Sequence, residues 1–154
     1  MQAYILRETI ISMVINSLFS LAFFLLVFGH AALVPVWGIG AYAFDALPQS
    51  IAIAVMSTLV PGAITIKRLR RGSIIAPSPM ASLSSPIFPR NIWLRACVMA
   101  LLAAVLGGLF NSTILLVLGQ EALPWRPALL GKLAYGAALA GLVTPPALRA
   151  ALRG

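Results

Sequence analysis

The chain has 154 residues, of which 61% are hydrophobic and 9% are charged, and its mean hydropathy is +1.01. Soluble domains have roughly 45–50% apolar and about 25% charged residues, so this composition excludes an ordinary soluble protein and indicates a membrane protein. The net charge of +8 is compatible with binding to nucleic acid, with binding to anionic lipid or with a role in orienting the chain in the membrane. The positions of the basic residues distinguish these three explanations.

Four apolar stretches follow one another along the chain, each close to the roughly 20 residues that cross a bilayer as a helix. They predict helices over residues 9–28, 46–66, 96–118 and 127–148. A cleaved signal peptide is disfavoured for the first stretch, because signal peptides have a shorter apolar region of about 7–15 residues. Residues 30–44 and 123–126 are expected to be interfacial loops between successive spans, since each contains Trp and Pro. The sequence therefore predicts an all-α membrane protein with four transmembrane helices.

Proline is expected to disturb two of these helices near the end of the span. Pro61-Gly62 predicts a kink or early fraying of the second helix, and Pro145-Pro146 predicts a distortion of the fourth helix.

A basic segment rich in proline and serine, residues 67–95, separates the first two apolar stretches from the last two. Its composition makes it a poor candidate for regular structure. We expect a linker here, between one transmembrane hairpin over residues 1–66 and a second over residues 96–154. Four basic residues open the linker directly after the second span: Lys67, Arg68, Arg70 and Arg71.

The basic residues are distributed unevenly across the membrane. Of the eleven Lys and Arg residues, only Arg126 and Lys132 fall on the side opposite to the linker. Because positively charged loops are retained in the cytoplasm, we expect both termini and the linker to be cytoplasmic, and the plasma (inner) membrane to be the location. The basic cluster then sets the topology, with contact to anionic lipid as an additional role. Nucleic acid is not an expected partner.

The two predicted hairpins resemble each other in sequence. LLVFG at residues 25–29 is echoed by LLVLG at 115–119, and three further landmarks recur in the same order: Pro35 and Pro124, Trp37 and Trp125, Tyr42 and Tyr135. Because each unit crosses the membrane twice, two copies would share one orientation as parallel repeats, related by an axis along the membrane normal. Chance similarity between leucine-rich spans is the alternative.

Polar residues recur every four positions along the first span: Glu8, Ser12, Asn16 and Ser20. This spacing places them on one side of a helix. An amide such as that of Asn16 is too costly to expose to hydrocarbon without a partner, so this side is expected to face protein. Two roles stay open, namely hydrogen bonding between helices and a polar pathway.

The third span carries a ridge of small residues at the same spacing: Ala96, Ala100, Ala104, Gly108 and Ser112. Such ridges allow helix backbones to approach closely. We expect the ridge either to pack the third helix against the fourth or to form a contact between copies of the chain.

Ionisable and amide side chains gather where the second span begins and one turn inside the fourth. Asp45 and Gln49 are one helical turn apart, and alignment of the repeat places Gln49 opposite Lys132. An Asp45–Lys132 ion pair closing the outer mouth of the bundle is the expected arrangement. It is open whether these residues form a binding site or only an interfacial salt bridge with a lysine that reaches the interface.

Enzyme chemistry is not expected. With one Cys and one His, the chain lacks a cysteine pair, an axial histidine pair or a set of zinc ligands, so no metal and no cofactor is predicted. The GxSxG and GxxxxGK[ST] patterns are absent as well. Two functions remain: a structural or accessory membrane subunit, packed in the bilayer with itself or within a larger complex, and a small transporter or channel.

Overall fold

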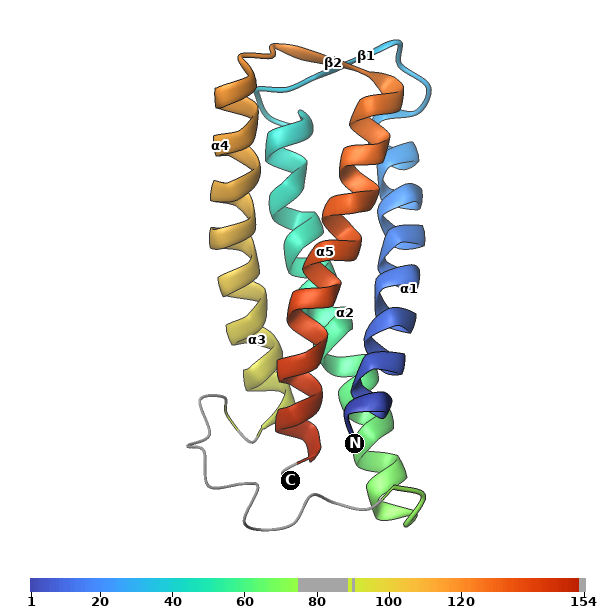
Figure 1. Cartoon of the computed structure of the whole chain (residues 1–154). Coiled ribbons are helices and arrows are strands. Elements are labelled where there is room, and N and C mark those ends of the chain that lie inside the picture. The colour runs from blue at the N-terminus through green and yellow to red at the C-terminus, as the bar shows by residue number, and fades with distance from the viewer. Residues whose placement is uncertain (75–88, 90, 153–154) are drawn as a thin grey trace.

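Four long helices stand side by side in the computed structural model, which describes residues 1–74, 89 and 91–152 (Figure 1). The spans are α1 (Gln2–Phe28), α2 (Tyr42–Arg70), a third span over Ile92–Leu118, and α5 (Trp125–Leu152). Each is long and apolar enough to cross a membrane, as the sequence predicts. The third span joins α3 (Ile92–Leu102), the π-helical η2 (Ala103–Gly107) and α4 (Gly108–Leu118).

Both described ends of the chain lie at the same end of the bundle (Figure 1). We call this the terminal end, because α1 begins there and α5 ends there; the opposite end is the strand end. Most of the predicted linker, residues 75–88 and 90, lies outside the described residues, as do residues 153–154.

The helices extend beyond the predicted apolar spans, above all at the terminal end. α2 continues through Pro48 and Pro61 to Arg70, and α5 continues through Pro145 and Pro146 to Leu152, so no proline ends its helix. Proline is tolerated inside membrane helices when neighbouring groups satisfy the backbone that it frees. At the strand end, α2 begins at Tyr42 rather than at residue 46, because its first turn lies ahead of the apolar stretch.

A glycine follows the first span and another follows the third span at the strand end. Gly29 follows α1 with φ 54°, and Gly119 follows α4 with φ 62°. Residues with a Cβ rarely adopt positive φ, so glycine suits both positions. They are the final residues of the echoed segments LLVFG and LLVLG.

Two short strands connect the loops of the strand end, and the sequence did not predict them. β1 (Leu33–Pro35) pairs with β2 (Ala122–Pro124) in an antiparallel ladder in which Val34 lies opposite Leu123. Hydrogen bonds from Val36 N–H to the Glu121 carbonyl (2.9 Å) and from Trp125 N–H to the Ala32 carbonyl (3.3 Å) extend the connection. The ladder ties the loop after α1 to the loop before α5.

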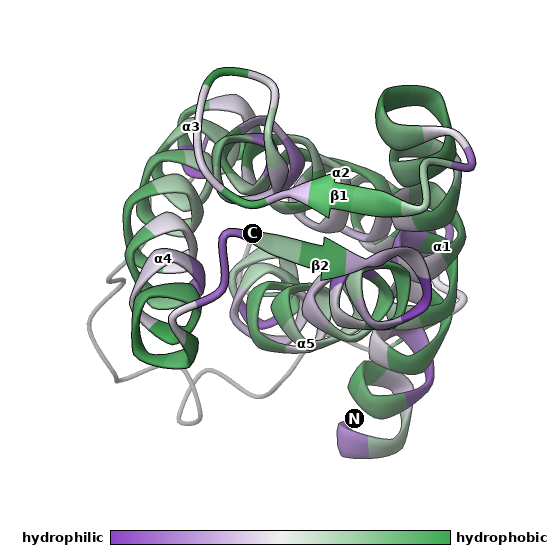
Figure 2. Cartoon of the chain, turned by 90° about the horizontal axis from the view of Figure 1, so that it is seen from above, coloured by the Kyte–Doolittle hydropathy of each residue, from purple (hydrophilic) through white to green (hydrophobic). Residues whose placement is uncertain are grey.

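The helices pack across the two halves of the chain rather than within each half. α2 and α5 lie together between α1 on one side and the third span on the other (Figure 2). α1 packs along α5, and the third span packs along α2. The third span thus packs mainly on α2 and less on the fourth helix, which it meets where Ala100 and Leu139 share a buried cluster.

Candidate functional site

The four polar residues that recur every four positions along α1 face the interior of the bundle. Glu8, Ser12, Asn16 and Ser20 are buried, and Ser20 is only 1% exposed. They meet polar side chains of α2 and α5, and together these groups form a row between the three helices, which we call the polar seam. Its members are Glu8, Ser12, Asn16, Ser20, Asp45, Gln49, Ser57, Arg68, Lys132 and Thr144.

One hydrogen-bonded group links all three helices midway along the seam. The Asn16 amide donates to Ser57 Oγ of α2 at 3.1 Å and to the backbone carbonyl of Ser12 at 2.8 Å. The Thr144 hydroxyl of α5 donates to Ser12 Oγ at 2.9 Å. An interhelical hydrogen bond of this kind contributes roughly 0.6–2 kcal/mol in a membrane. The stripe of α1 thus holds α2 and α5 together at its midpoint.

Gln49 connects the same helices nearer the strand end. Its side-chain amide donates to Ser20 Oγ at 2.8 Å and approaches the backbone carbonyl of Lys132 at 3.5 Å. Its side-chain oxygen is buried and has no hydrogen-bond partner among the described residues. Gln49 therefore lies beside Lys132, as the alignment of the repeat predicts, with one acceptor left unused.

The expected ion pair between Asp45 and Lys132 is present. Lys132 Nζ lies 2.8 Å from Asp45 Oδ2, and the two side chains are 2% and 6% exposed. The ammonium also lies 4.6 Å from the ring centroid of Tyr42. The ammonium therefore does not extend to the surface of the bundle, and its charge is neutralised inside it. In a pair this deeply buried, each charge is neutralised only by the other, so removal of one partner strongly destabilises the folded protein.

A second ionic group closes the seam at the terminal end. Glu8 Oε1 accepts hydrogen bonds from Arg68 of α2 at 2.7 Å and from its neighbour Arg7 at 2.9 Å. Tyr4 bridges the same two helices through a 2.8 Å hydrogen bond with Thr65. Arg68 is therefore engaged within the bundle. Among the described residues, Lys67, Arg70 and Arg71 form no ion pair.

Two of the seam partners, Ser57 of α2 and Thr144 of α5, were missed from the sequence. Ser57 and Thr144 are single hydroxyls in apolar stretches and carry little signal alone. In α2, however, Ser50, Ser57 and Thr65 recur about every two turns and are all buried. This spacing places them on one face, so the pattern was available in the sequence.

The small-residue ridge of the third span faces α2. Ala96, Ala100 and Gly108 are buried, whereas Ala104 and Ser112 are half-buried. A Cβ on Gly108 would lie 2.7 Å from Leu47 of α2. A Cβ on the adjacent Gly107 would meet the hydroxyls of Tyr135 and Ser50. The ridge therefore allows close approach, but its partner is the second span.

No family model, curated protein or solved structure matches the chain. Among the residues that the structure describes, no three His, Cys, Asp or Glu side chains are grouped as metal ligands. A function must therefore be argued from the seam and from the surface of the bundle.

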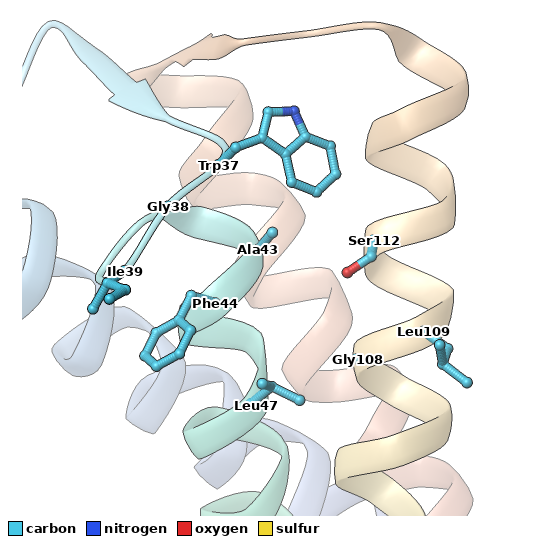
Figure 3. Close-up of a pocket in the computed structure, with 9 residues that line it drawn as sticks. All are labelled: Trp37, Gly38, Ile39, Ala43, Phe44, Leu47, Gly108, Leu109 and Ser112. Carbon is cyan, nitrogen blue, oxygen red and sulfur yellow. The ribbon is translucent and has the colours of Figure 1, made fainter.

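Towards the strand end, the third span and α2 leave an open crevice between them (Figure 3). Its volume is 490 Å³, and its walls are apolar except for Ser112, which points from α4 towards α2. The lining residues are Trp37, Gly38, Ile39, Ala43, Phe44, Leu47, Gly108, Leu109 and Ser112. The crevice has the character of a lipid-facing groove and brings no ionisable side chains together.

Proposed function

We propose that the protein is a structural or accessory membrane subunit without enzyme activity, which acts by helix packing with copies of itself or within a larger membrane complex. One observation carries this proposal. Each of the four polar residues at spacing four in α1 has a hydrogen-bond partner on α2 or α5, from the Glu8–Arg68 contact to the Ser20–Gln49 hydrogen bond. Groups engaged in this way hold the helices together. The apolar flanks of the bundle are then what the protein offers to partners in the bilayer.

A pull-down of the tagged full chain from its native membrane in a gentle detergent tests this role. We expect a fixed stoichiometry, either of several copies or of this chain with other membrane proteins. Recovery of a monomer with no other chain contradicts the proposal. Variants with Leu26→Ala and Val117→Ala, two strongly exposed positions on α1 and α4, compare the two flanks without touching the seam.

The proposal includes an orientation, with both termini in the cytoplasm at the plasma (inner) membrane. It also includes an origin by duplication, with the two hairpins as parallel repeats. Three features support a duplication. Gly29 and Gly119 end equivalent helices with positive φ, the ladder pairs Val34 with Leu123 directly before the echoed prolines, and α1 lies on α5 as the third span lies on α2. A topology reporter fused after Gly154 tests the orientation, and an external reporter overturns it.

A small transporter or channel is the second candidate, and a different observation favours it. A cleft of 80 Å³ between α1 and α2 is lined in part by Glu8, Ser12 and Asn16. A polar pathway that continued from this cleft towards the strand end would pass the unpaired oxygen of Gln49 and the buried Asp45–Lys132 pair.

Two substitutions separate these candidates, namely Asn16→Leu and Asp45→Asn. Purified variants are reconstituted in liposomes, proton and potassium flux are followed with trapped dyes, and assembly is followed by size-exclusion chromatography. Flux that is present in the parent and lost with assembly intact supports transport. Loss of assembly, with no flux even in the parent, supports the structural role. Ser17→Ala is the control, because that hydroxyl bonds only to the Met13 carbonyl of its own helix.

A further inference from the structure

We propose that the end of α2 and the start of α3 form a binding site for an anionic phospholipid. The site is a pocket of 410 Å³ at the terminal end. Lys67, Arg70 and Arg71 supply its basic rim, while Ala63, Ile66 and Ile92 supply its apolar floor. Neither helix packing nor transport requires such a site, so it goes beyond the proposed function.

The distribution of acidic residues leaves this rim without a counterion from the chain. The sequence contains three acidic side chains. Glu8 is engaged by Arg7 and Arg68, and Asp45 is engaged by Lys132. The third, Glu121, lies beside the ladder at the strand end, where its carbonyl accepts from Val36. No acidic side chain remains for the rim, which therefore favours an anion from outside the chain.

The spacing of the rim residues concentrates their charge on one side of α2. Lys67 is three residues before Arg70 and four before Arg71, which places all three near one another around the last turn. Like charges at this separation repel, and a phosphate between them relieves the repulsion. Guanidinium groups bind phosphate oxygens in a bidentate manner, and an ammonium adds a point charge. The rim therefore has the chemistry of a phosphate-binding site.

The floor of the pocket distinguishes a lipid from a soluble phosphate. Ala63 and Ile66 belong to the apolar part of α2, one turn before the rim. Ile92 closes the other side, since a Cβ on Gly62 would lie 3.0 Å from its Cδ1. Asn91 fixes the start of α3 by accepting from Trp93 N–H at 2.9 Å. An apolar floor beneath a cationic rim matches a phospholipid, whose headgroup phosphate lies directly above its acyl chains.

Arg68 belongs to the same basic cluster in the sequence but does not line the site. It lies between the rim residues in sequence, but it turns to the other side of α2 and donates to Glu8. We therefore assign to lipid binding only the three basic residues that face away from α1.

The experiment is a lipid titration of the purified full chain in neutral detergent micelles, read by native mass spectrometry. Phosphatidylglycerol is expected to bind, and phosphatidylcholine is expected to bind far less. The triple substitution Lys67→Gln, Arg70→Gln and Arg71→Gln removes three basic residues from near an anionic headgroup and is expected to weaken phosphatidylglycerol binding roughly 100-fold. Arg149→Gln, which removes an exposed arginine of α5 at the same end, is the matched control and should leave the affinity within about twofold.

Each other outcome overturns the proposal. Equal binding of the two lipids removes the role of the phosphate charge, and an equal loss in Arg149→Gln means that only total charge matters. Glycerol phosphate and inorganic phosphate are tested as competitors, and displacement of the lipid at equal concentration assigns the site to free phosphate instead. If the triple variant fails to fold by circular dichroism, Arg71→Gln alone is decisive, because Arg71 follows the last residue of α2. It should still lower the affinity several-fold.

Discussion

The contact of α1 with α5 and the contact of the third span with α2 occupy corresponding places on the two sides of the bundle, but they are built from different side chains. The first includes the hydrogen bond from Thr144 of α5 to Ser12 and the packing of Ser20 on Gly136 of α5. The second relies on alanine and glycine, and its polar contact is Ser50 of α2 against Gly107, with the hydroxyl of Tyr135 from α5 beside it.

Glycine occurs in both contacts, but on opposite partners. In the first contact, Ser20 of the outer helix packs onto Gly136 of the central helix α5. In the second, Gly107 belongs to the outer helix, and the hydroxyls of Tyr135 and Ser50 come from the central helices. The comparison teaches that helices in the same arrangement can be held together either by hydrogen bonds or by close approach of their backbones. In both contacts, a glycine on one helix makes room for a hydroxyl side chain of another.

The largest effect is expected between the two central helices, α2 and α5, which both contacts have in common. Asp45→Asn leaves Lys132 buried without a counterion, and we expect a loss of about 3–5 kcal/mol in the free energy of unfolding. Unfolding by SDS in mixed micelles, followed by circular dichroism, measures this loss. The double variant Asp45→Asn with Lys132→Met should recover most of it, because no unpaired charge remains. Coincident curves for the parent and the single variant would show that the pair is not buried.

The second-largest effect is expected where the third span meets the central helices. Gly107→Ala places a methyl group against the hydroxyls of Tyr135 and Ser50, and overpacking of this kind costs about 1–3 kcal/mol. Adding Tyr135→Phe removes one of these hydroxyls, so the double variant should be more stable than the two separate losses imply. Gly141→Ala is the control, because its new Cβ would make only an ordinary contact with Met13. Equal losses for the two alanine variants contradict this prediction.

A smaller effect compares the two echoed tryptophans. The Trp125 indole donates to the Gly29 carbonyl at 2.7 Å, whereas Trp37 is 43% exposed and has no such bond among the described residues. Trp125→Phe should therefore lower the stability by about 1 kcal/mol. Trp37→Phe should change it by less than about 0.5 kcal/mol. Thermal unfolding in a single detergent ranks the two variants, and the reverse order refutes the assignment.

The smallest effect concerns one hydrogen bond on the polar side. Ser20→Ala removes the acceptor of the Gln49 amide and should lower the free energy of unfolding by about 0.6 kcal/mol. Ser17→Ala removes a hydroxyl that bonds to its own helix, at Met13, and should have almost no effect. Because the expected difference is small, both variants are best compared in the same SDS titration. Equal stability of the two alanine variants would show that the Ser20–Gln49 hydrogen bond contributes nothing to stability.

Local features of the fold were predictable from the sequence. Hydropathy identifies the four spans, because a bilayer requires a long apolar run for each helix. The inward face of α1 follows from the spacing of Ser12 and Asn16. The Asp45–Lys132 pair was found because the echo between the two halves aligns Gln49 with Lys132.

Features that depend on the neighbouring helix were not predictable in this way. A ridge such as Ala96 and Ala100 indicates that some backbone comes close, but it fits the surface of α2 as well as that of α5. The ladder was missed because each strand is three residues long and ends in proline, which disfavours a strand. Nothing in the residues of η2 marks the extra residue of a π-helical turn.

The central position of α5 has a consequence for the order in which the chain is inserted during synthesis. α5 is translated after the other three spans, yet Thr144 is one of the partners of Ser12, and Gly136 receives Ser20. Until α5 enters the bilayer, the polar face of α1 is covered on the α2 side alone. A ribosome that stalls before residue 125 should therefore leave α1 exposed to membrane chaperones and proteases, and completion of α5 should end this vulnerable period.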